Sequence, residues 1–329
     1  MPSLLEVSHL SVGYGWDHDS TLTAVKAVDL RVEAGEVYGI AGESGCGKST
    51  LVQAVTGLLE PPGRILEGSV RFDGRDVLAL SKEDLRRLRL QEVSMVFQAS
   101  MNVLNPVTRI REQFADAMAA HGVTDRAEAH GRAEAMFELV KVPPRFLDAY
   151  PHQLSGGMRQ RAVIALCLVL RPRLIFLDEP TTALDVVVQR SILQSVNDLR
   201  REFGFAMVFI THDLSLLVEI ADRIAIMYAG EVVEEAPARA LYERPRHPYT
   251  KALMRSFPPL GGAKDRLEGI GGQPPDLRHM PPGCAFAPRC AERVNGRCDV
   301  RAPALMDLGG DHRVACHRHG PEGGAGHGG

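Results

Sequence analysis

The sequence predicts an α/β protein with a phosphate-binding loop, an inserted helical subdomain and a small cysteine-bearing C-terminal extension. Three observations carry this prediction: short β-rich runs alternate with helical stretches, a glycine-rich loop joins a strand to a helix, and four cysteines crowd the last fifth of the chain. At about 150 residues per domain, the 329 residues suggest roughly two domains. A hydrophobic fraction of 45% and a charged fraction of 24% exclude disorder throughout the chain.

Composition divides the chain into three parts. Residues 1–256 show the alternation of an α/β domain, and within them residues 105–170 are nearly strand-free and predict a helical subdomain. Residues 257–317 form the extension, which opens with a linker rich in Pro and Gly, and residues 318–329 are predicted to be a disordered Gly-rich tail. The candidate buried parallel strands are Val37–Ala41, Val93–Phe97, Leu174–Leu177, Ala206–Ile210 and Arg223–Tyr228.

The helical subdomain offers a clear helix start. In TDRAEAHGRAEAMFELV, either Thr124 or Asp125 can cap a helix N-terminus. The apolar residues that follow recur at helical spacing and predict one buried face. They are Ala133, Met136, Phe137 and Val140.

Charge and hydropathy exclude two classes of protein. The sum of 38 Lys and Arg against 41 Asp and Glu gives a net charge of −3, so we expect no nucleic-acid partner held by bulk charge. The longest apolar run, Ala162–Leu170, is far shorter than the roughly 18–20 residues of a membrane span. The N-terminus does not look like a signal peptide, and six unevenly placed cysteines do not look like a secreted disulfide framework, so the expectation is a cytoplasmic protein.

The strongest local signal is the loop GESGCGKST, which fits the phosphate-loop pattern G-x-x-x-x-G-K-[ST] at a strand-to-helix junction. Its glycines let successive N–H groups face one anion, and the helix N-terminus adds partial positive charge. Lys48 can reach the outer phosphates of a nucleotide, and the Ser49 hydroxyl can ligate Mg²⁺. A full match in this context disfavours a plain glycine-rich turn. The predicted contacts are Gly42, Glu43, Ser44, Gly45, Cys46, Gly47, Lys48, Ser49 and Thr50.

Further polar residues follow predicted strands, where open α/β sheets bind ligands. Asp178 can hold Mg²⁺, and Glu179 can deprotonate an attacking water, although an isolated Asp-Glu pair is most often a solvated strand end. The Gln98 amide can contact both Mg²⁺ and the attacking water, and the His212 imidazole can contact a γ-phosphate. Tyr14 can stack on adenine, with simple packing as its default role. Beside the phosphate loop, these residues predict an ATPase.

The motif LSGGMRQR, Leu154–Arg161, completes a set that resembles the nucleotide-binding subunits of ABC transporters. The set also contains the phosphate loop, Gln98, LDEP, TALD (Thr182–Asp185) and THD (Thr211–Asp213), in matching order and spacing. The resemblance implies that two subunits sandwich two ATP molecules head to tail. It implies that Ser155, Gly156 and Gly157 bind the γ-phosphate of ATP held by the opposite subunit, with Asp185 at the interface.

Longer segments narrow the resemblance to ATP-binding subunits of oligopeptide and dipeptide importers. They include YPHQLSGGMRQR, MYAGEVVEEAP, RPRHPYTKAL and the cysteine-bearing GCAFAPRC, and the similarity runs from about residue 4 to residue 317. One departure is Ala99–Ser100, where an acidic residue and proline are usual. Nickel importers share this subfamily, so the solute is less defined than the ATPase.

The resemblance implies import of a solute across the inner membrane, with the chain at its cytoplasmic face. The implied partners are a second nucleotide-binding subunit (a copy or a paralogue), two permease subunits and, indirectly, an extracytoplasmic solute-binding protein. The alternatives are an exporter subunit and a soluble ABC-type ATPase acting on nucleic acid or ribosomes. Only about 105 residues separate Lys48 from Leu154, which leaves little room for the long inserts common in the soluble class.

The four C-terminal cysteines follow the spacing C-x5-C-x7-C-x17-C, in Cys284, Cys290, Cys298 and Cys316. This spacing fits neither the usual structural zinc pairing nor a bacterial ferredoxin. Four thiolates could hold zinc or an iron–sulfur cluster, or remain free. Some peptide-importer subunits carry a 4Fe-4S cluster in this region, so the resemblance favours iron–sulfur. The expected role of the bound centre is structural: its binding free energy would fold a segment that has too few large apolar residues to fold without it.

Overall fold

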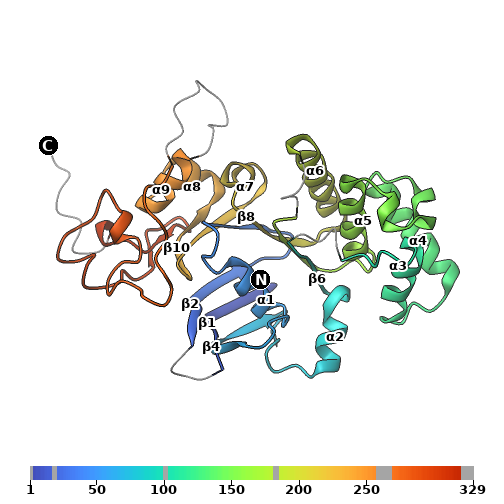
Figure 1. The fold of residues 1–329 in the computed structure, drawn as a ribbon, viewed down its shortest axis with the longest axis horizontal. Coiled ribbons are helices and arrows are strands. Elements are labelled where there is room, and N and C mark those ends of the chain that lie inside the picture. The colour runs from blue at the N-terminus through green and yellow to red at the C-terminus, as the bar shows by residue number, and fades with distance from the viewer. Residues whose placement is uncertain (1–2, 17–20, 99–102, 181–184, 257–268, 320–329) are drawn as a thin grey trace. The chain divides into compact units, whose positions relative to one another are not determined.

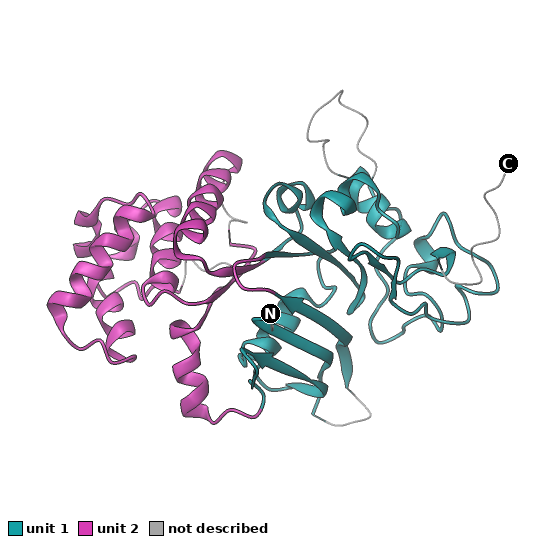
Figure 2. Ribbon diagram, turned by 180° about the vertical axis from the view of Figure 1, so that it is seen from behind, with its two compact units in different colours: residues 1–32, 37–78, 209–329 teal, residues 33–36, 79–208 magenta. Residues whose placement is uncertain are grey.

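The computed structural model describes residues 3–16, 21–98, 103–180, 185–256 and 269–319. The chain forms two compact units (Figure 2). The first unit comprises residues 1–32, 37–78 and 209–329, and the second comprises residues 33–36 and 79–208.

The first unit contains a four-stranded antiparallel sheet with the strand order β2-β1-β4-β5 (Figure 1). Its strands alternate apolar and polar residues, as expected for a sheet with one covered face. Leu5 and Val7 on β1 are 2% exposed, and Leu5 lies opposite Val32 on one side and Phe72 on the other. The strands are β1 (Leu5–Tyr14), β2 (Leu22–Val32), β4 (Gly63–Phe72) and β5 (Arg75–Asp76).

A second set of strands in the first unit has the order β11-β12-β10-β9-β3. Here β3 and β9 are parallel, with Tyr38 opposite Arg223, whereas β9 and β10 form an antiparallel hairpin. The strands are β3 (Val37–Ala41), β9 (Arg223–Tyr228), β10 (Glu231–Pro237), β11 (Met306–Asp307) and β12 (Arg313–Val314). The helices of this unit are α1 (Lys48–Val55), α7 (Leu214–Ile220), α8 (Ala238–Glu243) and α9 (Pro248–Arg255), with 3₁₀ turns η4 (Ala287–Arg289) and η5 (His317–His319).

The second unit pairs two parallel strands and holds most of the long helices. Its strands are β6 (Val93–Val96) and β7 (Leu174–Asp178), and β8 (Ala206–Thr211) contributes residues to both units. Its helices are α2 (Lys82–Gln91), α3 (Ile110–Ala119), α4 (Arg126–Leu139), α5 (Gly156–Leu168) and α6 (Val186–Phe203), with 3₁₀ turns η2 (Pro144–Asp148) and η3 (Pro151–Gln153).

The α/β prediction is confirmed, with small differences at strand ends. All five predicted strands form, but β6 ends at Val96, β7 extends to Asp178 and β8 extends to Thr211. Asp125, rather than Thr124, caps α4 by accepting a hydrogen bond from the Ala127 N–H at 2.9 Å. The four apolar residues of the predicted face, three on α4 and Val140 directly after it, are all 4% exposed or less.

The C-terminal segment packs within the first unit through charged partners as well as strand pairing. β12 pairs with β10, where two consecutive glutamates are almost fully buried. Glu234 accepts a hydrogen bond from the His312 ring at 2.7 Å and from the backbone N–H groups of Arg246 and His247. Burial alone would raise the pKa of Glu234. The hydrogen bonds from these groups have a larger opposite effect, so the pKa lies below its usual value. Glu235 pairs with Arg313.

In the part of the chain that the structure describes, no helix combines the length and hydrophobicity needed to cross a bilayer.

Candidate nucleotide-binding site

The phosphate loop connects β3 to α1, and its shape depends on glycine. Gly47 caps α1 with φ +101°, and a Cβ at this position would lie 2.4 Å from the Ala24 carbonyl oxygen. A Cβ on Gly42 would lie 2.2 Å from the Met227 carbonyl oxygen. Side chains at either position would clash with backbone, so the loop can curl only with glycine there.

Lys48 is 6% exposed, and its amine is held inside the loop. The Nζ donates to the carbonyl oxygens of Gly42 at 2.8 Å and Glu43 at 3.0 Å, and it lies 3.6 Å from the Cys46 sulfur. Burial raises the pKa of the Cys46 thiol, so this cysteine is a neutral packing residue at neutral pH. Ser44 and Gly45 are exposed at the tip of the loop, and Ser49 is half-buried. The loop thus presents N–H groups at its tip and a cation beneath them.

Two other predicted contacts belong to the same unit. The Tyr14 hydroxyl lies 3.1 Å from the Thr50 hydroxyl, so the end of β1 is tied to the first turn of α1. His212 is exposed directly after β8, and Asp213 next to it caps α7. The contact of Tyr14 is therefore to the loop helix, and stacking on adenine stays a prediction.

The predicted catalytic carboxylate lies in the second unit. The Gln98 amide donates to the Glu179 carboxylate at 3.1 Å, which brings together two residues 81 positions apart. Glu179 has φ +43°, in the left-handed region that non-glycine residues seldom adopt, and such geometry concentrates at functional sites. Asp178, at the end of β7, is 3% exposed.

The motif LSGGMRQR, called the signature from here on, begins a helix, as its predicted role requires. Ser155 caps α5, and its hydroxyl accepts from the Met158 N–H at 3.3 Å. Gly157 lies against α6, since a Cβ there would be 2.9 Å from a Val188 methyl. Asp185 caps α6 by accepting from the N–H groups of Val187 and Val188 at 3.1 and 3.0 Å. Thr182 and the Ala99–Ser100 departure lie outside the described residues.

Sequence reasoning missed two residues that contact the loop. The Tyr249 hydroxyl accepts from the Glu43 N–H at 2.9 Å, and Arg289 donates to the Glu43 carboxylate at 2.6 and 2.9 Å. Both lie in segments that carry the importer resemblance, RPRHPYTKAL and GCAFAPRC. The resemblance of these segments to importer subunits is the one feature of the sequence that points to Tyr249 and Arg289, and it implies no role for either residue.

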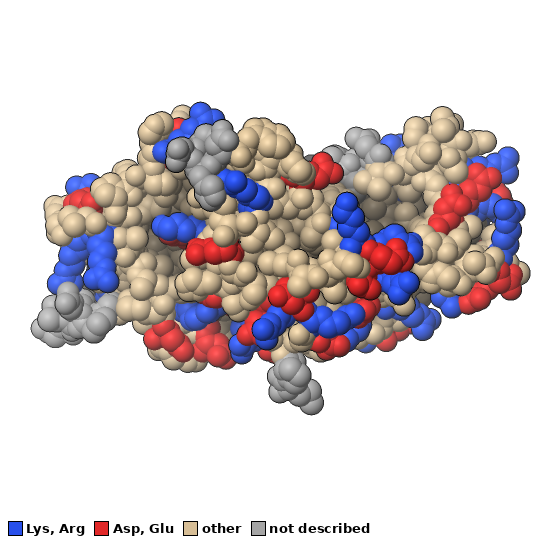
Figure 3. All heavy atoms as spheres, turned by 90° about the horizontal axis from the view of Figure 1, so that it is seen from below, with Lys and Arg blue, Asp and Glu red and all other residues tan. Residues whose placement is uncertain are grey.

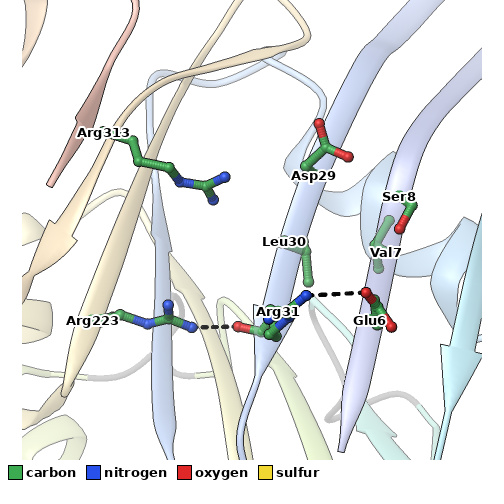
Figure 4. A pocket seen from close by; sticks show the side chains of 8 residues that line it. All are labelled: Glu6, Val7, Ser8, Asp29, Leu30, Arg31, Arg223 and Arg313. Carbon is green, nitrogen blue, oxygen red and sulfur yellow. Dashed lines mark hydrogen bonds and ion pairs between the residues drawn. The ribbon is translucent and has the colours of Figure 1, made fainter. Parts of the chain in front are cut away.

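A pocket of about 280 Å³ elsewhere in the first unit is lined by charged side chains (Figure 4). Its arginines already have partners, because Arg31 pairs with Glu6 at 3.1 Å and Arg223 donates to the Arg31 carbonyl oxygen at 2.5 Å. Within the described residues, its lining includes none of the predicted nucleotide contacts.

The four C-terminal cysteines are described, and all are free thiols. Burial, together with the nearby Cys298, Cys316 and Cys290, raises the pKa of Cys284 to about 11. The thiols are therefore close enough to interact. However, among the described residues no group of three or more His, Cys, Asp and Glu side chains is arranged to hold a metal ion. The predicted iron–sulfur or zinc site thus gains no support from this arrangement.

Comparison with known proteins agrees with this geometry. Residues 25–182 match the family described as ABC transporter, and residues 233–298 match the family described as oligopeptide/dipeptide transporter, C-terminal region. The dimeric ATP-binding cassette MJ0796 bound to ADP and Pi is 30% identical, with a TM-score of 0.63, covering 71% of this chain and 99% of that one. These matches define an ATP-hydrolysing cassette of the ABC transporter family.

Full-length relatives define the branch of the family. A probable peptide ABC transporter ATP-binding protein, y4tR of Sinorhizobium fredii, is 43% identical over 96% of this chain and 95% of its own. The dipeptide transport ATP-binding protein DppD of Escherichia coli is 41% identical, covering 96% of both chains. The oligopeptide transport ATP-binding protein OppD of Escherichia coli is 43% identical over 96% of this chain and 93% of its own. The chain belongs to the ATP-binding subunits of peptide ABC transporters.

Proposed function

We propose that this chain hydrolyses ATP at the cytoplasmic face of the inner membrane to power import of peptides, or of a related solute, through separate permease subunits. The observation that carries the proposal is the extent of the similarity. Relatives named for dipeptide and oligopeptide transport are matched over 93–96% of their own length, and residues 233–298 match the family described as oligopeptide/dipeptide transporter, C-terminal region.

The described residues would supply the roles that hydrolysis needs. Apart from the Glu43 N–H, which donates to Tyr249, the N–H groups of the phosphate loop would bind the β- and γ-phosphates, with Lys48 as the cation. Ser49, Gln98 and Asp178 offer a hydroxyl, an amide oxygen and a carboxylate, the hard oxygen ligands that would hold Mg²⁺ and let it neutralise phosphate charge. Glu179 would accept the proton of the attacking water, and His212 would contact the γ-phosphate.

The signature helix provides a second phosphate contact. The N–H groups of the first turn of α5 and the Ser155 hydroxyl would form an anion-binding helix end. In the proposed assembly this end meets ATP held by a second subunit, a copy or a paralogue. Two permease subunits complete the transporter, and an extracytoplasmic solute-binding protein delivers the solute.

The rival class, a soluble ATPase acting on nucleic acid, would favour a surface with gathered basic charge. On the face drawn in Figure 3, basic and acidic side chains are interspersed. This mixture is consistent with protein partners, and a direct experiment separates the classes.

Co-expression with permease chains of a peptide importer from the same organism is the test of the proposal. We expect the chain to copurify with two integral membrane proteins, and vesicles holding this complex and its binding protein to hydrolyse ATP faster when peptide is added. Copurification with ribosomes or nucleic acid, without membrane chains, would show that the chain serves a different system.

For the C-terminal segment we propose a bound iron–sulfur cluster, held by Cys284, Cys290, Cys298 and Cys316. What supports it is the chemistry of the donor set, four thiols in one loop-rich segment, although the described side chains are not arranged around a metal ion. When bound, the cluster would contribute ordering free energy to the segment.

The change Cys290→Ser tests this cluster. Protein purified without oxygen is expected to be brown and to contain iron and acid-labile sulfide, and the variant is expected to be bleached. Limited proteolysis should then cut the variant faster after about residue 261, while the core still binds ATP. If the protein contains zinc and no iron, the cluster is refuted and a structural zinc site takes its place. If protein purified without oxygen contains no metal, both kinds of site are refuted.

A further inference from the structure

The C-terminal segment reaches the phosphate loop through an ion pair whose arginine is buried and whose carboxylate is half-buried. The Arg289 guanidinium donates from Nη1 to Glu43 Oε2 at 2.6 Å and from Nη2 to Glu43 Oε1 at 2.9 Å, across 246 positions of sequence. This bidentate arrangement is the strongest geometry that an arginine and a carboxylate can adopt. The Arg289 side chain is 4% exposed.

Arg289 has no spare donor. Its Nε donates to the Gly271 carbonyl oxygen at 2.9 Å, while Nη1 and Nη2 also donate to the Tyr228 hydroxyl and the Ile270 carbonyl oxygen, each at 3.3 Å. Together with the two bonds to Glu43, all five N–H groups of the guanidinium are used. A buried arginine satisfied in this way is fixed in position, so Glu43 is fixed with it.

Glu43 is held at three points. Its N–H donates to the Tyr249 hydroxyl, its carbonyl oxygen accepts from the Lys48 amine, and its carboxylate accepts from Arg289. Lys48 is the residue proposed to reach the outer phosphates. A continuous set of hydrogen bonds therefore runs from the C-terminal segment to the lysine of the loop.

The charge of Glu43 explains why such a partner is needed. A carboxylate in a loop that binds a polyphosphate would repel the ligand, and the repulsion is strongest where water is excluded. Arg289 compensates this charge and keeps both carboxylate oxygens occupied. The loop can then present N–H groups, instead of a free carboxylate, to the incoming phosphates.

The position of Arg289 depends on the segment around the cysteines. It ends the turn η4, directly before Cys290, and the preceding Phe286 packs its ring against Tyr228 and Tyr249, each with ring centroids 5.3 Å apart. The aromatic contacts place the turn on β9 and α9. The arginine is thus delivered to the loop by the C-terminal segment.

We propose that Arg289 is a positioning residue for nucleotide binding, which restrains and neutralises Glu43 so that the phosphate loop accepts ATP. This inference rests on ATP binding by residues 42–50 and adds a dependence of that binding on the C-terminal segment. If Arg289 acts by neutralising Glu43, the loss of ATP affinity caused by removing Arg289 should disappear when residue 43 carries no charge.

The test is a cycle of variants with ATP titration of the purified full-length chain. Arg289→Ala is expected to weaken ATP binding by about 10–100-fold, within the usual range for coupling between sites. Glu43→Gln provides the reference affinity of a loop without this charge, and the double variant should bind ATP with the same affinity as Glu43→Gln. In turnover measurements, the effect of Arg289→Ala should fall on KM more than on kcat.

A matched control removes an ion pair of the same segment that does not touch the loop. Lys251 pairs with Glu292 at 2.9 Å, two residues beyond Cys290, so Glu292→Gln should leave ATP affinity unchanged. If Arg289 only supported folding of the segment, the double variant would stay as weak as Arg289→Ala, which would overturn the proposal. Equal affinity of Arg289→Ala and the unaltered chain would also overturn it, whereas failure of the unaltered chain to bind ATP would instead remove the proposed nucleotide site.

Discussion

Glu179→Gln is expected to lower steady-state ATP turnover by on the order of 10²–10⁴-fold, the usual contribution of a general acid–base group. The amide has nearly the shape of the carboxylate, so it can keep a hydrogen bond to Gln98, yet it cannot accept a proton from water. ATP binding should persist because Lys48, Ser49 and Asp178 are unaltered. Turnover of the purified variant and a nucleotide titration measure the two effects separately.

Lys48→Ala serves as the comparison for this experiment. It removes the buried amine that lies on the carbonyl oxygens of the loop, so it should weaken nucleotide binding itself. Unchanged turnover in Glu179→Gln would refute its assignment as the base. Weakened ATP binding in Glu179→Gln would instead place this carboxylate among the groups that hold the nucleotide.

Ser155→Arg is expected to abolish ATP-driven pairing of two subunits, while each subunit still binds ATP through its own phosphate loop. The serine side chain caps α5, and in the proposed assembly the same helix end receives the γ-phosphate of the opposite nucleotide. An arginine there is too large for a sandwiched ligand. Size-exclusion chromatography with ATP, in the Glu179→Gln background that prevents hydrolysis, measures the result.

Ser155→Ala separates the loss of the cap from the added bulk. Removing a serine cap typically costs about 1 kcal/mol of stability, which leaves the helix in place. We expect this variant to pair more weakly than the unaltered chain but better than Ser155→Arg. Pairing by Ser155→Arg at the level of the unaltered chain would mean that the signature does not meet the opposite site.

The local features of the fold could be predicted because their causes are local. Asp125 caps α4 and the strand Arg223–Tyr228 forms as the residue pattern indicates, since a cap and a buried strand depend on near neighbours. The glycines of the phosphate loop follow the same logic, because their positive φ angles are a property of the turn itself.

The contacts across the chain could not be predicted in this way. Nothing in the residues around Glu43 indicates Arg289 or Tyr249, because pairings over 200 positions depend on how β9, α9 and η4 come together. The extension likewise seemed too poor in large apolar residues to order itself. In the structure the extension is held by contacts with the rest of the first unit. Phe286 packs on tyrosines of β9 and α9, and the His312 ring is hydrogen-bonded to the buried Glu234.

The pairing of Glu43 with Arg289 also has a consequence for synthesis of the chain. The two residues are 246 positions apart, and at about 5–20 residues per second the ribosome makes them roughly 12–50 s apart. Throughout that interval the nascent chain carries a finished loop sequence whose carboxylate has no arginine. On the proposed role of Arg289, the loop reaches its high-affinity form only once synthesis has entered the last eighth of the polypeptide, so products that end before Arg289 should bind ATP weakly.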